Sequence, residues 1–248
     1  MNETFLLIGA SSDLALEFLE ELFSKDSQSK YKIYATYYSD STQLEAIKNS
    51  HLYNFFEIVK CDLSDYNDLN NLRSIIESND DYPDYIIHFA AAKFEYMRIR
   101  DFDWEKVKHD LDIQVGSLAY ICKWFLPEMK KKHYGRVIAI ATEYTLGVPP
   151  KFLSNYIVSK YALVGIVKAL ASEYSGSGIT FNAISPGMME TKFLDNIDER
   201  TAEINAKNSA MKRNISLKEV TGAVFYLLSD SASYVNGINM NLSGGNYM

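Results

Sequence analysis

The chain has 248 residues, of which 47% are hydrophobic and 23% are charged. This composition is typical of a globular protein and excludes a largely disordered chain. The formal net charge is −7, and no long basic run occurs. Nucleic acid and anionic membranes are therefore not expected as the main partners.

The start of the chain and the two cysteines indicate the compartment. An acid, Glu3, stands where a secretory signal would have basic residues, and the apolar run 5–8 is short. No stretch approaches the roughly 18 apolar residues of a membrane-spanning helix. Cys61 and Cys122 are far apart and form no C-x-x-C pair, which favours free buried thiols over disulfides or a metal site. We expect a soluble cytoplasmic protein without a bound metal.

Residues 4–23 predict a strand, a glycine-bearing turn and a helix, which together open a βαβ unit. Such a turn directs backbone N–H groups at a phosphate. The usual dinucleotide pattern has three glycines, but only Gly9 is present, with Asp13 and Ala15 at the other two places. Asp13 is either a helix N-cap or a side chain that faces away from the phosphate and accepts backbone N–H groups.

A second predicted strand, 32–37, ends at Tyr38 and Ser39. In dinucleotide-binding folds an acid at this place holds the ribose 2′-hydroxyl of NAD, whereas a phosphate-binding group admits NADP. No acid stands at the expected position, although Asp40 is close. NADP(H) is favoured over NAD(H) because three hydroxyls follow the strand, those of Ser39, Ser41 and Thr42. The alternative is that these residues only turn the chain and cap the next helix.

The third and fourth predicted strands, 55–60 and 84–92, also end in candidate ligand-binding residues. Asp62 follows the third strand, where a carboxylate can reach an adenine amino group, or where Ser64 or Asp65 simply caps the helix 66–76. The fourth strand ends in three alanines. Either these small residues allow a flat ligand to approach closely, or they only pack tightly within the fold. His88 lies within apolar sequence, which favours a satisfied core histidine over a catalyst.

The remaining segments continue the alternation of strands and helices. A long helical stretch, 104–129, precedes a fifth strand, 135–141, a helix, 156–175, and a sixth strand from 178. Residues 188–214 are polar and less regular, and are predicted to form a mobile lid. A helix, 216–228, and a strand with a double glycine close the chain. We expect an α/β fold, one doubly wound parallel sheet in a single domain over residues 1–248.

Tyr156 and Lys160 are four residues apart and share one face of the predicted helix 156–175. An ammonium beside a phenol favours the phenolate, so the pKa of the tyrosine is predicted to fall from about 10. Such a group is a proton donor for a reaction that develops an alkoxide. The spacing alone is common by chance, and its meaning depends on the other motifs.

The motifs occur in a consistent order: Gly9-Ala10-Ser11-Ser12, Cys61-Asp62-Leu63, Thr142, Tyr156-x-x-x-Lys160, Asn182-x-x-x-Pro186-Gly187 with Thr191, and Gly244-Gly245. Together they closely resemble the short-chain dehydrogenase/reductase family over essentially the whole chain. The resemblance implies a Rossmann-like fold with seven parallel strands and a nicotinamide cofactor. It implies that Tyr156 is the general acid/base, that Lys160 tunes it and binds the nicotinamide ribose, and that the Thr142 hydroxyl orients the substrate carbonyl. Thr145 is a less favoured substitute for Thr142.

The resemblance also implies a set of cofactor-binding residues: Gly9, Ser11, Ser12, Asp13, Leu14, Tyr38, Ser39, Asp62, Leu63, Ala90, Ala91, Lys160, Pro186, Gly187, Met189 and Thr191. Three departures from the family pattern mark a divergent member. Gln114 stands for the helical asparagine that supports a proton relay, His88-Phe89 for the usual asparagine pair, and Asp13 and Ala15 for two glycines.

We expect an oxidoreductase that transfers hydride between nicotinamide and a ketone or secondary alcohol. The resemblance extends to 3-oxoacyl-carrier-protein reductases, so a carrier-bound 3-oxoacyl chain or a keto-sugar is the expected substrate. Four basic residues would form an entrance for an acidic carrier: Lys192, Lys207, Lys212 and Arg213. The alternative is that they are only solvated charges of the lid. The alternative is a non-catalytic binding or regulatory protein. Two strongly apolar helical stretches predict a homodimer or homotetramer.

Overall fold

The computed structural model describes residues 3–25, 31–50, 55–92, 95–192 and 199–247. Within them, seven parallel strands form one sheet in the order β3-β2-β1-β4-β5-β6-β7. The strands are β1 (Glu3–Ile8), β2 (Tyr31–Tyr37), β3 (Phe56–Lys60), β4 (Tyr85–His88), β5 (Gly135–Ile140), β6 (Ile179–Pro186) and β7 (Asn239–Leu242). The predicted fold class is confirmed.

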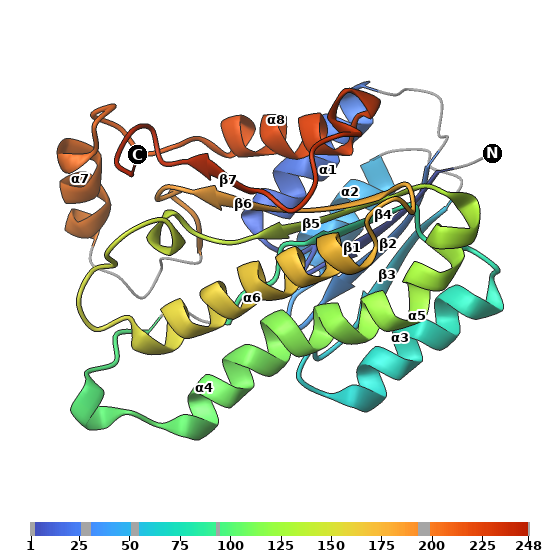
Figure 1. Ribbon diagram of the computed structural model, residues 1–248, viewed down its shortest axis with the longest axis horizontal. Helices are drawn as coiled ribbons and strands as arrows, with labels where there is room; N and C mark the ends of the chain where they lie inside the picture. Colours follow the sequence, from blue (N-terminus) through green and yellow to red (C-terminus); the bar gives the residue numbers. More distant parts are fainter. Residues whose placement is uncertain (1–2, 26–30, 51–54, 93–94, 193–198, 248) are drawn as a thin grey trace.

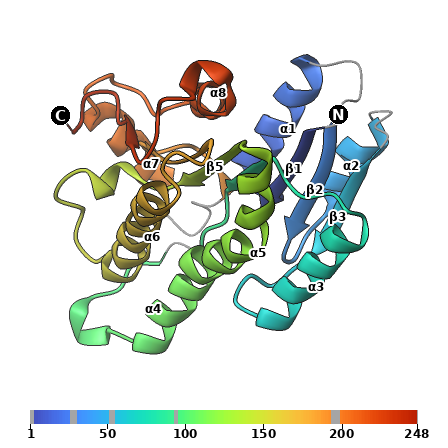
Figure 2. The ribbon, with the colours of Figure 1, turned by 45° about the vertical axis from the view of Figure 1, so that its right-hand side comes forward.

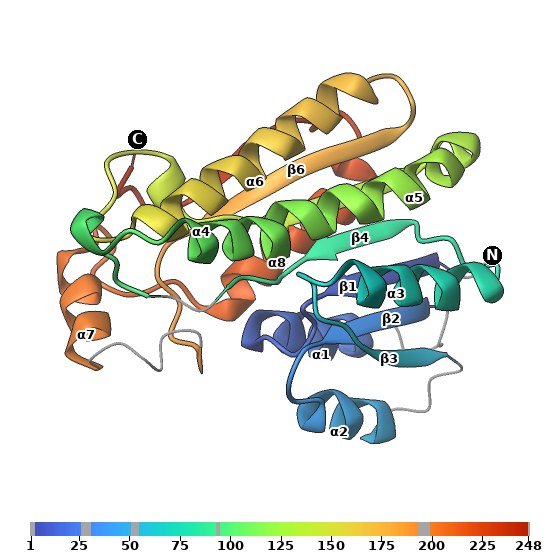
Figure 3. The ribbon, with the colours of Figure 1, turned by 90° about the horizontal axis from the view of Figure 1, so that it is seen from below.

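Helices cover both faces of the sheet (Figures 1 and 2). The helices are α1 (Asp13–Lys25), α2 (Thr42–Ser50), α3 (Tyr66–Ser78), α4 (Trp104–Leu111), α5 (Ser117–Lys132), α6 (Ser154–Glu173), α7 (Glu199–Asn208) and α8 (Leu217–Leu228). The α1 and α8 helices lie on one face, and α3, α5 and α6 lie across the other, as Figure 3 shows from below. None of the helices in the described ranges is long and apolar enough to cross a membrane.

Most of the core of the described residues lies in two hydrophobic clusters, one on each face of the sheet. Successive residues of β1 alternate between them: Leu6 and Ile8 belong to the cluster under α3, α5 and α6, whereas Phe5 and Leu7 belong to the cluster under α1, α2 and α8. Because parallel strands are buried on both faces, they appear in the sequence as continuous apolar runs. The free thiols of Cys61 and Cys122 are buried, as predicted.

The carboxyl edge of the sheet contains the point at which the strand order reverses. The chain passes from β1 outward to β3 and returns to β4 on the other side of β1. Ligands of open α/β sheets bind at this kind of edge. Gly9 turns the chain there with φ = 75°, and a Cβ on Gly9 would lie 2.7 Å from Ala90, so only glycine fits.

The fourth strand is shorter than predicted, because it ends at His88 and not at Ala92. The N–H of Phe89 still donates to the carbonyl of Ile8, at 2.9 Å, but β1 then turns away at Gly9 and offers no further acceptors. Ala90 and its two following alanines therefore form a loop at the carboxyl edge.

Two helical predictions also need correction. The stretch 104–129 is not one regular helix, because a π-helical segment, Asp112–Gly116, separates α4 from α5. The stretch 188–214 is not irregular throughout, because it contains α7, which lies at the same end of the molecule as the C-terminus (Figure 1). Residues 193–198 of the predicted lid lie outside the described residues, and the predicted mobility of the lid stays a prediction.

Candidate active site

Three side chains predicted to be catalytic come together at the carboxyl edge. The Tyr156 hydroxyl makes a side-chain hydrogen bond with Thr142, which follows β5. Lys160 lies one turn further along α6, with Nζ 5.9 Å from the centre of the Tyr156 ring, and donates to the carbonyl of Ile140 at 2.8 Å. All three side chains are buried, so their geometry is fixed by packing.

Burial, not the neighbouring ammonium, dominates the protonation of the pair. It raises the pKa of Tyr156 to about 12, although the hydrogen bond from Thr142 acts in the opposite direction, and the Glu143 carboxylate raises the value further. Burial likewise lowers the pKa of Lys160 to about 7. The prediction of a lowered tyrosine pKa is therefore wrong for this structure, because a low-dielectric site favours the neutral form of both groups.

Thr145 does not replace Thr142. Its hydroxyl donates to the Thr142 carbonyl at 2.9 Å, and it also bonds Ser185 and Asn239 on β6 and β7. Because these contacts occupy the hydroxyl, Thr142 is the residue that presents a hydroxyl to Tyr156.

Gln114 lies in the π-helical segment, fully buried. Its Nε2 donates to Ser159 Oγ at 2.8 Å, next to Lys160 on α6, whereas its Oε1 has no hydrogen-bond partner in the described part of the chain. π-Helical insertions are often found at functional sites. Gln114 thus contacts the residue beside the lysine and not the lysine itself, which is the displaced arrangement that a longer side chain predicts.

His88 is a core residue, as predicted, but it is not fully satisfied, because its Nδ1 has no hydrogen-bond partner in the described part of the chain. Its Nε2 bonds Ser117 Oγ at 3.1 Å, and Ser117 in turn donates to the carbonyl of Ile113 in the π-helical segment. Burial, helped by the charge of Lys160, lowers the pKa of His88 to about 3. The side chain is therefore neutral and joins β4 to α5.

The loop after β1 fits a cofactor phosphate. Ser12 Oγ accepts the N–H of Ala15. The N–H groups of Asp13 and Leu14, at the start of α1, find no acceptor in the described part of the chain. Free N–H groups at a helix N-terminus suit an anion. The Asp13 carboxylate faces away from them and accepts the backbone N–H of Lys192 at 2.7 Å, which is the second of its two predicted roles.

The candidate adenosine residues lie along the ends of β2 and β3. Tyr38 and Ser39 are exposed. Asp40 Oδ1 accepts both the N–H and the hydroxyl of Thr42, so the Thr42 hydroxyl is already engaged. Asp62 similarly accepts from Ser64, while Asp65 caps α3 as predicted. A contact between Asp62 and adenine stays a prediction.

The remaining candidate cofactor residues lie at the same edge. Pro186 ends β6, and the N–H of Gly187 donates to the carbonyl of Leu242 at 3.2 Å. Met189 packs against the core under α1 and α8, and Thr191 directly precedes the residue that bonds Asp13. On the other side lie the buried Leu63, Ala90 and the half-buried Ala91.

Glu143 is a site residue that no sequence motif singled out, although an acid directly after the Thr142 hydroxyl at the end of the fifth strand is a signal. Glu143 is 2% exposed and lines a cavity of about 480 Å³ together with Tyr144. Tyr144 also packs against Tyr156. Tyr144 therefore links the cavity to the candidate acid, although Thr142, Tyr156 and Lys160 are not among the residues that line the cavity.

Residues 26–246 match the family model described as Enoyl-(Acyl carrier protein) reductase. The chain belongs to the short-chain dehydrogenase/reductase family. As a member of this family it is an NAD(P)-dependent oxidoreductase. A 3-oxoacyl-[acyl-carrier-protein] reductase of Buchnera aphidicola subsp. Schizaphis graminum is 29% identical over 100% of this chain and 98% of the relative. The D-beta-hydroxybutyrate dehydrogenase of Rhizobium meliloti is 29% identical over 65% of this chain and 67% of that protein. The crystal structure of levodione reductase shares the fold, with a TM-score of 0.88 and 23% identity over 99% of this chain and 97% of that one.

Proposed function

We propose that this protein is a ketoreductase that uses NADP(H) and in which Tyr156 is the general acid/base. One observation carries the proposal: the Tyr156 hydroxyl bonds Thr142, with Lys160 one turn away, at the edge where the sheet reverses. A hydroxyl pair at this place can hold a carbonyl oxygen between two donors. The cofactor supplies the hydride when bound.

Tyr156 and Lys160 are the residues proposed to transfer the proton. At neutral pH a phenol with a pKa of about 12 keeps its proton, so Tyr156 can give it to an oxygen that becomes an alkoxide. In the reverse direction, the deprotonated Tyr156 accepts the proton of the alcohol. Lys160, with a pKa lowered to about 7, is a group that can exchange protons near neutral pH, and the carbonyl of Ile140 keeps its amine in place.

The preference for NADP(H) has local support at the end of β2. Asp40, the nearest acid, is committed to Thr42 and carries a lowered pKa because of those hydrogen bonds. The Lys192 amine lies 3.3 Å from Gln43 Oε1 on α2, and its charge acts on Asp40, so a cation stands near the ribose end. A basic group there favours a 2′-phosphate.

The relative from Buchnera supports a carrier-bound 3-oxoacyl substrate. The predicted basic entrance is partly engaged, because Arg213 is paired with Glu219 at 2.6 Å. A keto-sugar is the second candidate, because Asn205, Asn208 and Ser209 line the cavity beside Tyr144. Polar lining residues fit a hydroxylated substrate better than a bare acyl chain.

The enzyme should be assayed by NADPH oxidation with acetoacetyl thioesters and small ketones, comparing wild type with Tyr156→Phe. Tyr234→Phe is the control, because Tyr234 is a fully exposed tyrosine outside α6. Loss of one acid/base group should lower kcat by about 10²- to 10⁴-fold. If Tyr156→Phe retains turnover within a few fold, Tyr156 is not the acid. If the wild type binds NADP(H) but reduces no substrate, the binding-protein alternative gains support.

Self-association is also part of the proposal. Val158 and Tyr161 are exposed on α6 at 44% and 46%, and helices with such apolar faces commonly bury them against another subunit. Light scattering should give the mass of a dimer or tetramer. A mass near the 28.2 kDa of one chain would contradict it.

A further inference from the structure

A buried carboxylate that has no cationic partner among the described residues lies beside the proposed acid. Glu143 begins the single helical turn that follows Thr142 and is almost fully buried. None of the ion pairs found among the described residues involves it. Removing a carboxylate from water costs free energy unless a charge or several hydrogen bonds replace the water. The fold alone gives no reason for an acid at this position.

The carboxylate is held between the two walls of the site. Its Oε2 accepts a hydrogen bond from Asn246 Nδ2 at 3.1 Å. A Cβ on Gly187 would lie 3.5 Å from the same oxygen, so the carboxylate rests against the glycine backbone next to β6. Its charge acts on Tyr156, Tyr144 and Tyr247. Glu143 is therefore close to the reacting end of the site, at the start of the cavity.

The rest of the described cavity wall is uncharged and mixes polar residues with apolar ones such as Pro150 and Ala210. Asn205, Asn208 and Ser209 come from α7 and its end, and Asn246 comes from the C-terminal segment. No lysine or arginine belongs to the described lining. A bound molecule that placed an ammonium or a hydroxyl on Glu143 would supply a donor in addition to Asn246, the donor found among the described residues.

We infer that Glu143 is a specificity residue, which binds a hydroxyl or ammonium donor on the carbon next to the substrate carbonyl. The closeness of Glu143 to the proposed acid supports this position. Glu143 directly follows Thr142, and its carboxylate charge raises the pKa of Tyr156. The inference rests on the proposed ketoreductase function and narrows its substrate to donor-bearing ketones. It disfavours an unsubstituted acyl chain at this subsite, because an apolar group would leave the buried carboxylate with the Asn246 amide as its one donor among the described residues.

Three ketones of equal heavy-atom number test the inference: aminoacetone, hydroxyacetone and butan-2-one. Wild type at neutral pH should favour the first two over butan-2-one in kcat/KM by about tenfold or more, the value of one charge-assisted hydrogen bond. Glu143→Leu should abolish this preference while butan-2-one is still reduced. Glu143→Gln keeps an acceptor oxygen without the charge. It should therefore retain the preference for hydroxyacetone and lose most of the preference for aminoacetone.

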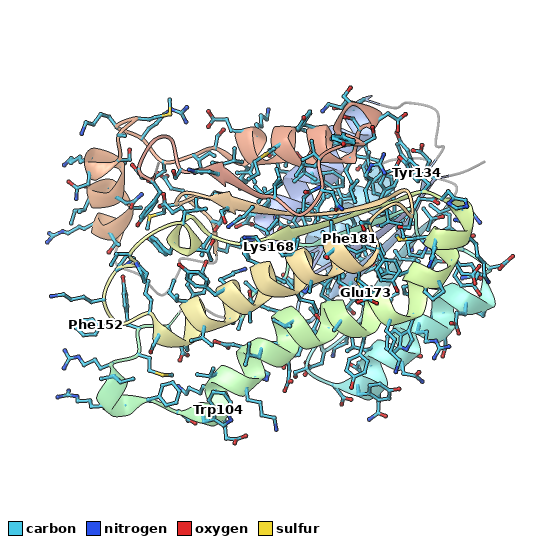
Figure 4. All side chains as sticks on the ribbon, in the orientation of Figure 1. Trp104, Tyr134, Phe152, Lys168, Glu173 and Phe181 are labelled. Atoms are coloured by element: carbon cyan, nitrogen blue, oxygen red, sulfur yellow. The ribbon has the colours of Figure 1, made fainter. Side chains whose placement is uncertain are left out.

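The matched control is Glu173→Gln, which removes an exposed carboxylate at the far end of α6. Figure 4 labels Glu173 at the opposite end of that helix from Phe152. The control should leave all three ratios unchanged. Absence of a preference in wild type, or an equal loss for all three ketones in Glu143→Leu, overturns the inference and leaves the ketoreductase proposal standing.

A failure of the proposed ketoreductase function can be distinguished from a failure of the Glu143 subsite. If wild type reduces none of the ketones, the dissociation constants of 1-aminopropan-2-ol, propane-1,2-diol and butan-2-ol, measured calorimetrically with NADP⁺ present, test the subsite alone. Tighter binding of the first two by about tenfold, lost in Glu143→Leu, supports the Glu143 subsite. Equal binding of the three alcohols overturns it. Circular dichroism of each variant verifies that it is folded.

Discussion

Asp13 Oδ2 accepts a hydrogen bond from the backbone N–H of Lys192 at 2.7 Å, although 179 positions separate the two residues. The bond joins the start of α1 to the segment that follows β6. It also explains how the chain accommodates an acid where dinucleotide-binding loops usually have glycine. The carboxylate is engaged by Lys192, and the N–H groups of Asp13 and Leu14, which have no acceptor among the described residues, are available to a phosphate.

Asp13→Asn should bind NADP⁺ more tightly than wild type. The amide oxygen can still accept the N–H of Lys192, but the negative charge near the phosphates is removed. One charge at a partly exposed site corresponds to about 1 kcal/mol, or roughly a fivefold lower Kd. Isothermal titration calorimetry measures the change, with Glu17→Gln on α1 as control. Unchanged or weaker binding would show that the Asp13 charge is not felt at the cofactor.

Gly9→Ala should destabilise the fold and impair cofactor binding. The added Cβ would lie 2.7 Å from the backbone of Ala90, and φ at this position is 75°. Overpacking and a strained backbone together cost about 2 kcal/mol or more. Gly222→Ala is the matched control, because that helical glycine has nothing within 4 Å of the new Cβ. It should gain about 0.5–1 kcal/mol in urea unfolding. Equal effects of the two substitutions would contradict the tight contact at Gly9.

Lys160→Met should stabilise the protein most at low pH. Because burial lowers the lysine pKa from 10.5 to about 7, an ammonium at this place penalises the folded state fully below pH 7. Between these two values the unfolded chain binds the extra proton, so wild-type stability rises with pH. The difference in unfolding free energy between variant and wild type should shrink by about 1.4 kcal/mol per pH unit over that window. Chemical denaturation at several pH values measures it, and a pH-independent difference would refute the lowered pKa.

Ser159→Ala should destabilise the fold and alter the pH profile of turnover. The substitution leaves the Gln114 amide buried without its acceptor, which costs about 1–3 kcal/mol. If this contact positions α6 around Lys160, the pH dependence of kcat should shift as well. Ser172→Ala, at an exposed position of α6, is the control for loss of a helical hydroxyl. A stability loss without any change in the pH profile would assign Ser159 a structural role alone.

Local sequence patterns determined most of the fold. The continuous apolar strands, the glycine at the first turn and the cap at Asp65 each depend on residues close in the chain, so their positions could be predicted. The order of motifs also indicated the family and placed Thr142, Tyr156 and Lys160 in one site. Helical spacing fixes the relation between the tyrosine and the lysine, and the parallel sheet brings the end of β5 beside them.

Tertiary structure decided the properties that depend on burial and on distant partners. The pKa of Tyr156 is raised and not lowered, because burial of the phenol favours its neutral form more than the hydrogen bond from Thr142 favours the phenolate. Asp13 finds its partner in Lys192, and Glu143 is enclosed by Gly187 and Asn246, residues that no local pattern connects. Desolvation and long-range contacts arise only when the sheet is assembled, so the sequence alone determined which groups are present, and the assembled fold determined their charge and their partners.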